Sequence, residues 1–171
     1  TGTTGPEAVD LAVASTVATG LNVPWGLAFL PDGDALLSQR DAATIVRIST
    51  SGDVTELGPV PGVSPGGEAG LLGIALDPDD PSVLFAFTTT DADDRVLRMS
   101  IADDTISDVT AILTGIPIGS RHHGGRLLFD TDGMLFVSTG DAGRGETAQD
   151  RDALGGKILR MVDPDGFKVE V

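Results

Sequence analysis

Residues 25–48 read WGLAFLPDGDALLSQRDAATIVRI, and this stretch holds the pattern that decides the fold. A short apolar segment is followed by a Pro-Asp-Gly turn, by a second apolar segment, and by a third segment in which Arg47 interrupts an apolar run. The same succession recurs over residues 72–99 and 125–161. Repetition at a spacing of about fifty residues is typical of propellers and other repeat arrays.

The segments themselves predict β structure. Apolar runs of four to six residues alternate with turns that are rich in aspartate. The chain contains 23 glycines and ten prolines, and no helical periodicity appears. We therefore predict an all-β protein, a β-propeller built of four-stranded blades. After a flexible lead-in over residues 1–8, the propeller portion covers residues 9–171, with blades at about 21–57, 70–113 and 122–171.

Three blades are too few for a closed ring, because propellers have roughly four to eight. We interpret the chain as three blades of a six-bladed ring. It would be either half of a longer protein or one of two copies that pair as a homodimer about a two-fold axis. The run Val9–Val17 alternates apolar with small or polar residues and is predicted as an additional strand.

The amino-acid composition disfavours several classes of binding partner. The net charge of -15 disfavours nucleic acid and anionic lipid, and no apolar run is long enough for membrane insertion. Absence of cysteine excludes disulfides and thiolate metal sites. The chain begins at Thr1 in a small, polar stretch, which is expected of a mature secreted or periplasmic protein.

The two histidines, His122 and His123, lie just before the first strand of the third block. If the segment is extended, His122 shares one side with Gly124 and Arg126, and His123 points the other way. One histidine would then face the central axis, where it could act as a general base near neutral pH. The alternative, a structural histidine, stays open on this pattern alone.

Two carboxylates accompany the histidines. Glu68 precedes the first strand of the second block, at the position equivalent to the histidine pair, and is predicted to point toward the same axis. Asp141 ends the second strand of the third block, just before a long insertion that reaches Gly156. A base with an orienting carboxylate is a recurrent catalytic pairing, although Asp141 beside Gly140 could equally be a turn former.

Acidic clusters at residues 77–80 and 91–94 could in principle hold Ca²⁺. Neither has the regular ligand spacing of a calcium loop, and solvated turns are the commoner use of such residues. From the residues alone we predict no metal ligands.

Four motifs then occur in one order: Pro24–Phe29, Gly67–Gly73, His122–Leu127 and Gly155–Arg160. Together they resemble the soluble dehydrogenases for glucose and aldose sugars that depend on pyrroloquinoline quinone (PQQ). The resemblance extends from about residue 17 to 166. It implies a six-bladed propeller with PQQ and Ca²⁺ at the mouth of the central channel.

The resemblance also implies a reaction: a base takes the proton of the C1 hydroxyl of an aldose, a hydride passes to the quinone, the sugar becomes a lactone, and an electron acceptor reoxidises the cofactor. His122 matches the base and Asp141 an aspartate near it. Glu68 stands where glucose-oxidising members carry a sugar-contacting glutamine, Arg121 where some carry a substrate-contacting aspartate, and Glu146 near another substrate contact. The cofactor-binding residues are expected mostly in later blades.

Two alternatives stay open, and the departures at Glu68 and Arg121 favour the first of them. One is a non-catalytic propeller that serves as a binding or interaction module and lacks the half that grips the cofactor. The other is a propeller hydrolase that acts on lactones through a carboxylate-held metal. The hydrolase is disfavoured because only Glu68 and Asp141 are candidate inward carboxylates.

Overall fold

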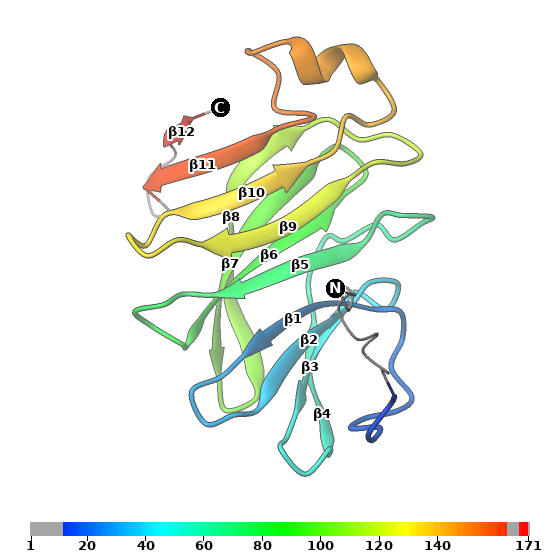
Figure 1. Ribbon diagram of the computed structural model, residues 1–171, viewed down its shortest axis with the longest axis vertical. Coiled ribbons are helices and arrows are strands. Elements are labelled where there is room, and N and C mark those ends of the chain that lie inside the picture. Colours follow the sequence, from blue (N-terminus) through cyan, green and yellow to red (C-terminus); the bar gives the residue numbers. More distant parts are fainter. Residues whose placement is uncertain (1–11, 164–167, 171) are drawn as a thin grey trace, which may run out of the picture.

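The computed structural model describes residues 12–163 and 168–170 of the chain. The described residues form three four-stranded antiparallel sheets that follow one another in chain order (Figure 1). The first sheet holds β1 (Pro24–Phe29), β2 (Ala35–Gln39), β3 (Thr44–Ile48) and β4 (Val54–Pro59); the second holds β5 (Leu71–Leu76), β6 (Val83–Thr89), β7 (Asp94–Ala102) and β8 (Thr105–Ile116); the third holds β9 (Gly124–Phe129), β10 (Leu135–Thr139), β11 (Ile158–Asp163) and β12 (Lys168–Glu170). The prediction of an all-β chain with four-stranded blades is confirmed.

Two expectations concern the N-terminal part of the chain. The predicted lead-in over residues 1–8 lies outside the described residues, as do residues 9–11 of the predicted additional strand. Residues 12–17 form no strand, so that prediction is wrong there. Alternation marks an extended chain, but a strand also needs a neighbour that accepts its backbone hydrogen bonds, and these residues pair with no described strand.

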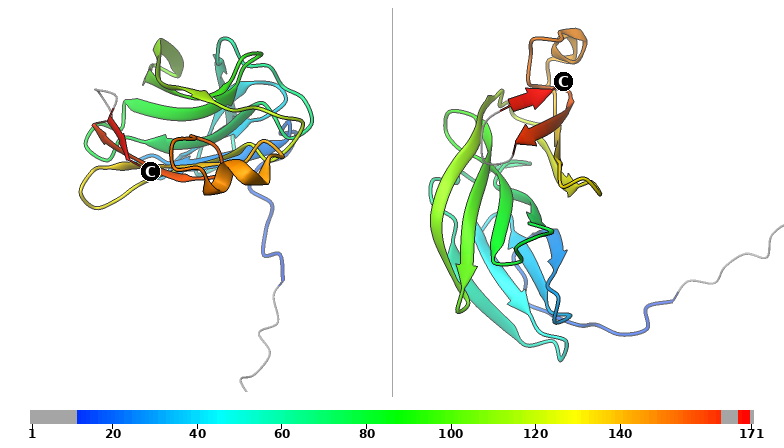
Figure 2. Two further views of the ribbon diagram at one scale, coloured as in Figure 1. Left: turned by 90° about the horizontal axis from the view of Figure 1, so that it is seen from above. Right: turned by 90° about the vertical axis from the view of Figure 1, so that its left-hand side faces the viewer.

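The sheets are arranged as neighbouring blades, with the first strand of each on one side. Strand β1 lies beside β5, and β5 lies beside β9 (Figures 1 and 2). In every sheet the chain runs up and down through adjacent strands, so the fourth strand is the one farthest from the neighbouring first strands. Loops that precede β5 and β9 consequently meet at one end of the molecule.

Glycine allows the first strands to approach so closely. A Cβ atom on Gly26 of β1 would stand 2.8 Å from the carbonyl oxygen of Leu72, and one on Gly73 of β5 would stand 2.0 Å from the carbonyl oxygen of Gly125. These two glycines occupy equivalent positions of the repeat, and block three carries Arg126 there. The sequence motif thus records where one blade packs on the backbone of the next.

A buried serine joins the first two blades at the same place. The Ser38 hydroxyl accepts a hydrogen bond from the Gly26 N–H at 2.8 Å and donates one to the Leu72 carbonyl at 2.5 Å. Its side chain is fully buried. The contact therefore satisfies backbone groups that would otherwise be left without partners between the blades.

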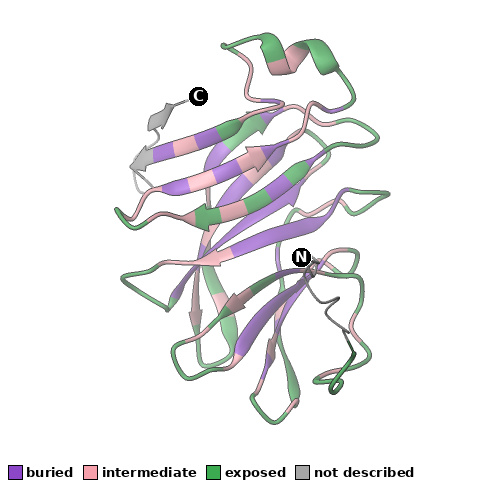
Figure 3. Cartoon of the chain, viewed as in Figure 1, coloured by how far each residue is buried: buried purple, intermediate pink, exposed green. Residues whose placement is uncertain are grey.

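Strand β6 lies at the centre of the core, and all of its residues are buried (Figure 3). Alternate side chains along a strand point to opposite faces. Val83, Phe85 and Phe87 accordingly pack in the cluster shared with the third sheet, whereas Leu84 and Ala86 pack in the cluster shared with the first. The middle blade is thus covered on both faces by its neighbours.

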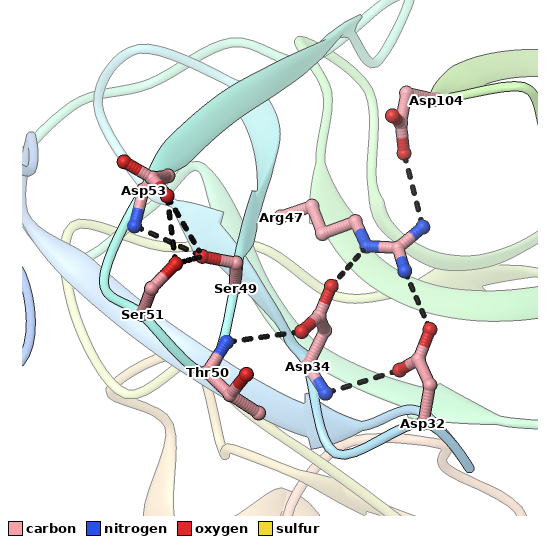
Figure 4. A network of polar contacts seen from close by, with 8 residues as sticks. All are labelled: Asp32, Asp34, Arg47, Ser49, Thr50, Ser51, Asp53 and Asp104. Carbon is pink, nitrogen blue, oxygen red and sulfur yellow. Dashed lines mark hydrogen bonds and ion pairs between the residues drawn. The ribbon is translucent and has the colours of Figure 1, made fainter.

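The repeated arginine of the third strand also acquires a role. Arg47 on β3 donates to Asp34 at 2.8 Å and to Asp32 at 2.6 Å in its own blade, and reaches Asp104 of the β7–β8 turn at 3.2 Å (Figure 4). The hydrogen bond from Arg47 is the largest of the effects that lower the pKa of Asp34. This network links the acidic turn of blade one to blade two.

Among the described elements there is no helix with the length and apolar character needed to cross a membrane.

Replacing Gly73 by Ala is expected to lower the free energy of unfolding by about 3 kcal/mol, because the new methyl would meet a backbone oxygen that cannot move aside like a side chain. Chemical denaturation followed by circular dichroism measures this loss. The matched control is Gly145→Ala, where the methyl would meet open space, and where we expect a change within about 0.5 kcal/mol. Equal effects of the two substitutions would contradict the close-packing account.

Candidate active site

The chain bends sharply at the histidine pair. His122 has a φ of 61°, Gly124 of 77° and Gly125 of 96°, all in the left-handed region. The expectation of an extended segment from His122 onward is therefore wrong, since strand β9 begins only at Gly124. The two histidines nevertheless diverge as expected: the His122 side chain is 52% exposed, and that of His123 is 3% exposed.

His122 and Asp141 form a hydrogen-bonded pair. Nδ1 of His122 lies 2.8 Å from Oδ1 of Asp141, which also accepts the N–H of Gly143 at 2.8 Å. The hydrogen bond from His122, with the backbone bond from Gly143 next, lowers the pKa of Asp141 below its ordinary value. An ionised Asp141 places the neutral ring's proton on Nδ1 and leaves Nε2 as the acceptor.

The pair borders an open hollow of about 480 Å³. Its lining residues come from the loop before β9, from β10, from the insertion and from the start of β11; they are His122, Ser138, Thr139, Asp141, Ala148, Gly156, Lys157 and Ile158. The insertion contains η1 (Gly145–Gln149), a short 3₁₀ helix that the sequence did not predict. A ligand in this hollow would lie beside the His122 side chain.

Lys157 is the lining residue that sequence reasoning missed. Its Nζ donates to the carbonyl of Thr147 at 2.6 Å and to that of Gly155 at 2.9 Å, so it ties the insertion to the start of β11. Gly156 allows the insertion to return to β11, because it has a φ of 69° and because Ala148 lies too close for a side chain there. The sequence feature that could have indicated Lys157 is the motif at residues 155–160, which contains it.

His123 belongs to the interior. Its Nδ1 lies 2.9 and 3.0 Å from the two carboxylate oxygens of Asp94, and Asp94 also accepts the hydroxyl of Thr89 at 2.6 Å. Burial raises the pKa of Asp94, an effect that the bonds from Thr89 and His123 only partly offset. This histidine holds β7 of blade two against the start of blade three.

The other predicted site residues are placed as follows. Glu68 accepts the backbone N–H of His122 at 2.6 Å and lines a small cavity of about 190 Å³ with Trp25, Arg40, His123 and Gly124. Arg121 and Glu146 are exposed, and neither lines the His122 hollow. The positive charge of Arg121 contributes to the low pKa of Asp141. The substrate-contact roles of these three residues stay predictions.

The acidic turns are engaged with their own backbone. Oδ1 of Asp77 accepts the N–H groups of Asp79 and Asp80, and Oδ1 of Asp130 accepts those of Asp132 and Met134. Across the part of the chain that the structure describes, no three or more His, Asp or Glu side chains gather in a way that could hold a metal ion. The carboxylates of these two turns therefore cap their own backbone.

Comparison with known families matches residues 21–169 to the model described as Glucose / Sorbosone dehydrogenase. The chain belongs to the glucose/sorbosone dehydrogenase family. The resemblance drawn from the four motifs is thereby confirmed.

Individual members of the glucose/sorbosone dehydrogenase family agree. The fold matches the PQQ-bound aldose sugar dehydrogenase of Streptomyces coelicolor with a TM-score of 0.86 at 49% identity, over 90% of this chain and 48% of that one. Aldose sugar dehydrogenase YliI of Escherichia coli K12 is 32% identical over 84% of this chain and 42% of its own length. Quinoprotein glucose dehydrogenase B of Acinetobacter calcoaceticus is 29% identical over 77% and 31%. The chain thus spans less than half the length of each of these relatives.

The described residues do not by themselves fit PQQ and Ca²⁺. A quinone with several carboxylates needs several cations directed at it, but Lys157 is the one Lys or Arg among the described residues that line the hollow, and two of its three ammonium donors already bind carbonyls. As stated above, no described carboxylate cluster suits Ca²⁺. The expectation that later blades supply the cofactor grip stays a prediction.

In a carboxyl-carbon NMR titration, Asp141 should titrate below its ordinary value of 3.8, and His122→Ala should move its pKa upward because the largest lowering hydrogen bond is lost. Since folding favours the ionised carboxylate, the stabilisation is present above pH 3.8 and is lost as the pH falls through the lower folded-state pKa. Asp80, whose pKa is lowered by Ser82, is the internal control and should not move. An unmoved Asp141 would rule out the ring contact.

His123→Ala is expected to lower the free energy of unfolding by about 3 kcal/mol, because it leaves the Asp94 carboxyl buried without its ring partner. His122→Ala, its neighbour in sequence, should change stability by no more than about 0.5 kcal/mol, since that side chain is exposed. Denaturant titration of the two variants compares them directly. Similar losses at both positions would contradict the division between a buried and an exposed histidine.

Proposed function

We propose that this chain contributes the general base of a PQQ-dependent dehydrogenase that oxidises the C1 hydroxyl of aldose sugars to lactones. The observation that carries the proposal is the exposed His122 ring, bonded through Nδ1 to Asp141 and bordering an open hollow. Support also comes from the family match and from relatives named as aldose sugar and quinoprotein glucose dehydrogenases.

In this proposal the residues of the chain carry the proton transfer. Asp141 fixes the ring so that Nε2 presents its lone pair to a sugar hydroxyl, and Nε2 takes the hydroxyl proton. The imidazolium that forms remains beside the Asp141 carboxylate at 2.8 Å, which stabilises its charge. Acceptance of the hydride is the part of the chemistry that bound PQQ supplies.

A non-catalytic binding module is the second candidate. It is favoured by one observation: the described residues around His122 do not fit the cofactor without further groups. Titrating the chain with PQQ and Ca²⁺ while following quinone absorbance separates the candidates. Absence of binding at high protein concentration favours the module, whereas saturable binding favours the dehydrogenase. Dependence on Ca²⁺, secretion, the electron acceptor and pairing of two chains stay predictions.

With PQQ, Ca²⁺, an aldose and an artificial electron acceptor, His122→Ala should reduce turnover by roughly 10²- to 10⁴-fold, the usual contribution of a general base. The matched control is Asp132→Asn, at an exposed turn of the same blade, which should retain wild-type turnover. Dye reduction followed in a spectrophotometer gives both rates. A His122→Ala variant that keeps more than about a tenth of wild-type turnover would remove His122 from this role.

A further inference from the structure

The backbone of His122 is held in a conformation that it would not adopt unaided. A φ of 61° is unfavourable for a residue with a Cβ atom and is normally left to glycine. Surrounding contacts must therefore select it. The position of the ring depends on this choice, because the Cβ direction changes with the backbone.

Three contacts from two blades hold this residue. The N–H of His122 donates to Oε2 of Glu68 at 2.6 Å, and its carbonyl accepts the N–H of Ala142 at 3.3 Å. The ring bonds to Asp141 at 2.8 Å. Ala142 and Asp141 belong to the loop after β10, so Glu68 is the only one of these partners that comes from blade two.

Glu68 is itself presented by a well-defined turn. Gly66 and Ala69 exchange two backbone hydrogen bonds, of 3.2 and 2.9 Å, and Gly67 between them has a φ of 60°. On the far side, Gly70 lies so close to blade one that a Cβ there would stand 2.4 Å from the carbonyl oxygen of Arg40. The glutamate is therefore fixed at the tip of a short turn rather than on a long, mobile loop.

From this geometry we infer that Glu68 is a positioning residue for His122: its carboxylate fixes the left-handed backbone that keeps the ring on Asp141. The inference rests on the proposed function of His122 as the base. It gives Glu68 a different role from the sugar contact that the resemblance implies. A bond from a backbone N–H to an ionised carboxylate is charge-assisted, and so suits a contact that must hold an unfavourable conformation.

The inference predicts different results for two substitutions at position 68. Gln at position 68 keeps an oxygen that can accept the His122 N–H, whereas Ala does not. Glu68 is exposed, so neither change leaves a buried charge without a partner, and both variants should fold. Glu56→Ala, at an exposed position on β4, is the control for loss of a surface carboxylate.

The first test needs no cofactor. The chain has two histidines, so the ring nitrogens of histidine-labelled protein give two sets of NMR signals, and His123 serves as an internal reference. We expect the wild type, Glu68→Gln and Glu56→Ala to show His122 with its proton on Nδ1. Glu68→Ala should show a mixture of tautomers at His122 and an unchanged His123. A wild-type His122 spectrum in Glu68→Ala would overturn the inference.

The second test distinguishes positioning from sugar contact. Under the dye assay, Glu68→Ala should lower kcat by roughly 10- to 100-fold with KM within about threefold, and Glu68→Gln should recover most of the loss. A raised KM at unchanged kcat would instead make Glu68 a sugar contact. If wild-type protein shows no dehydrogenase activity, the proposed function fails, and the tautomer measurement still decides whether Glu68 holds His122.

Discussion

The close approach of the first strands is the constraint on which the rest of the structure depends. At Gly26 and Gly73 one blade lies against the backbone of the next at distances that leave no room for a side chain. That approach brings the turn before β5 next to the loop before β9, so that Glu68 and His122, 54 positions apart, share a hydrogen bond. The hollow beside His122 lies within blade three, and blade packing adds the Glu68 contact from blade two.

The two adjacent histidines have different environments: His123 is buried and His122 is half exposed. His123 enters the interior and meets a carboxylate of blade two, where burial and hydrogen bonding fix it. His122 turns outward through a left-handed backbone, and its half-exposed side chain borders a hollow. Arg126, two residues into β9, lies with its guanidinium 4.0 Å from the centre of the Trp25 ring and so ties blade three to blade one. One short segment thereby joins three blades and presents the His122 ring.

Many of the acidic side chains of this strongly negative chain form hydrogen bonds within their own turns. Aspartates at the turns accept backbone N–H groups within their own turns, and Arg47 forms ion pairs with three aspartates of two blades. Solvated carboxylates at turns are the ordinary result of repeated Pro-Asp-Gly sequences. Two aspartates are set apart by a histidine partner: Asp94 in the interior and Asp141 beside the hollow.

The sequence by itself determined the strands of the three blades and the repeat, because strand alternation and turn residues act over a few positions; it did not predict the short helix η1. The break in the repeat also pointed to the histidine pair and to Asp141, and the motif match then selected His122 rather than His123. Only the tertiary structure decided that Lys157 ties down the insertion and that Glu68 reaches the His122 backbone. Neither follows from local pattern, because a left-handed backbone at a non-glycine residue, and a contact between two blades, are imposed by packing rather than by the residue's own preference.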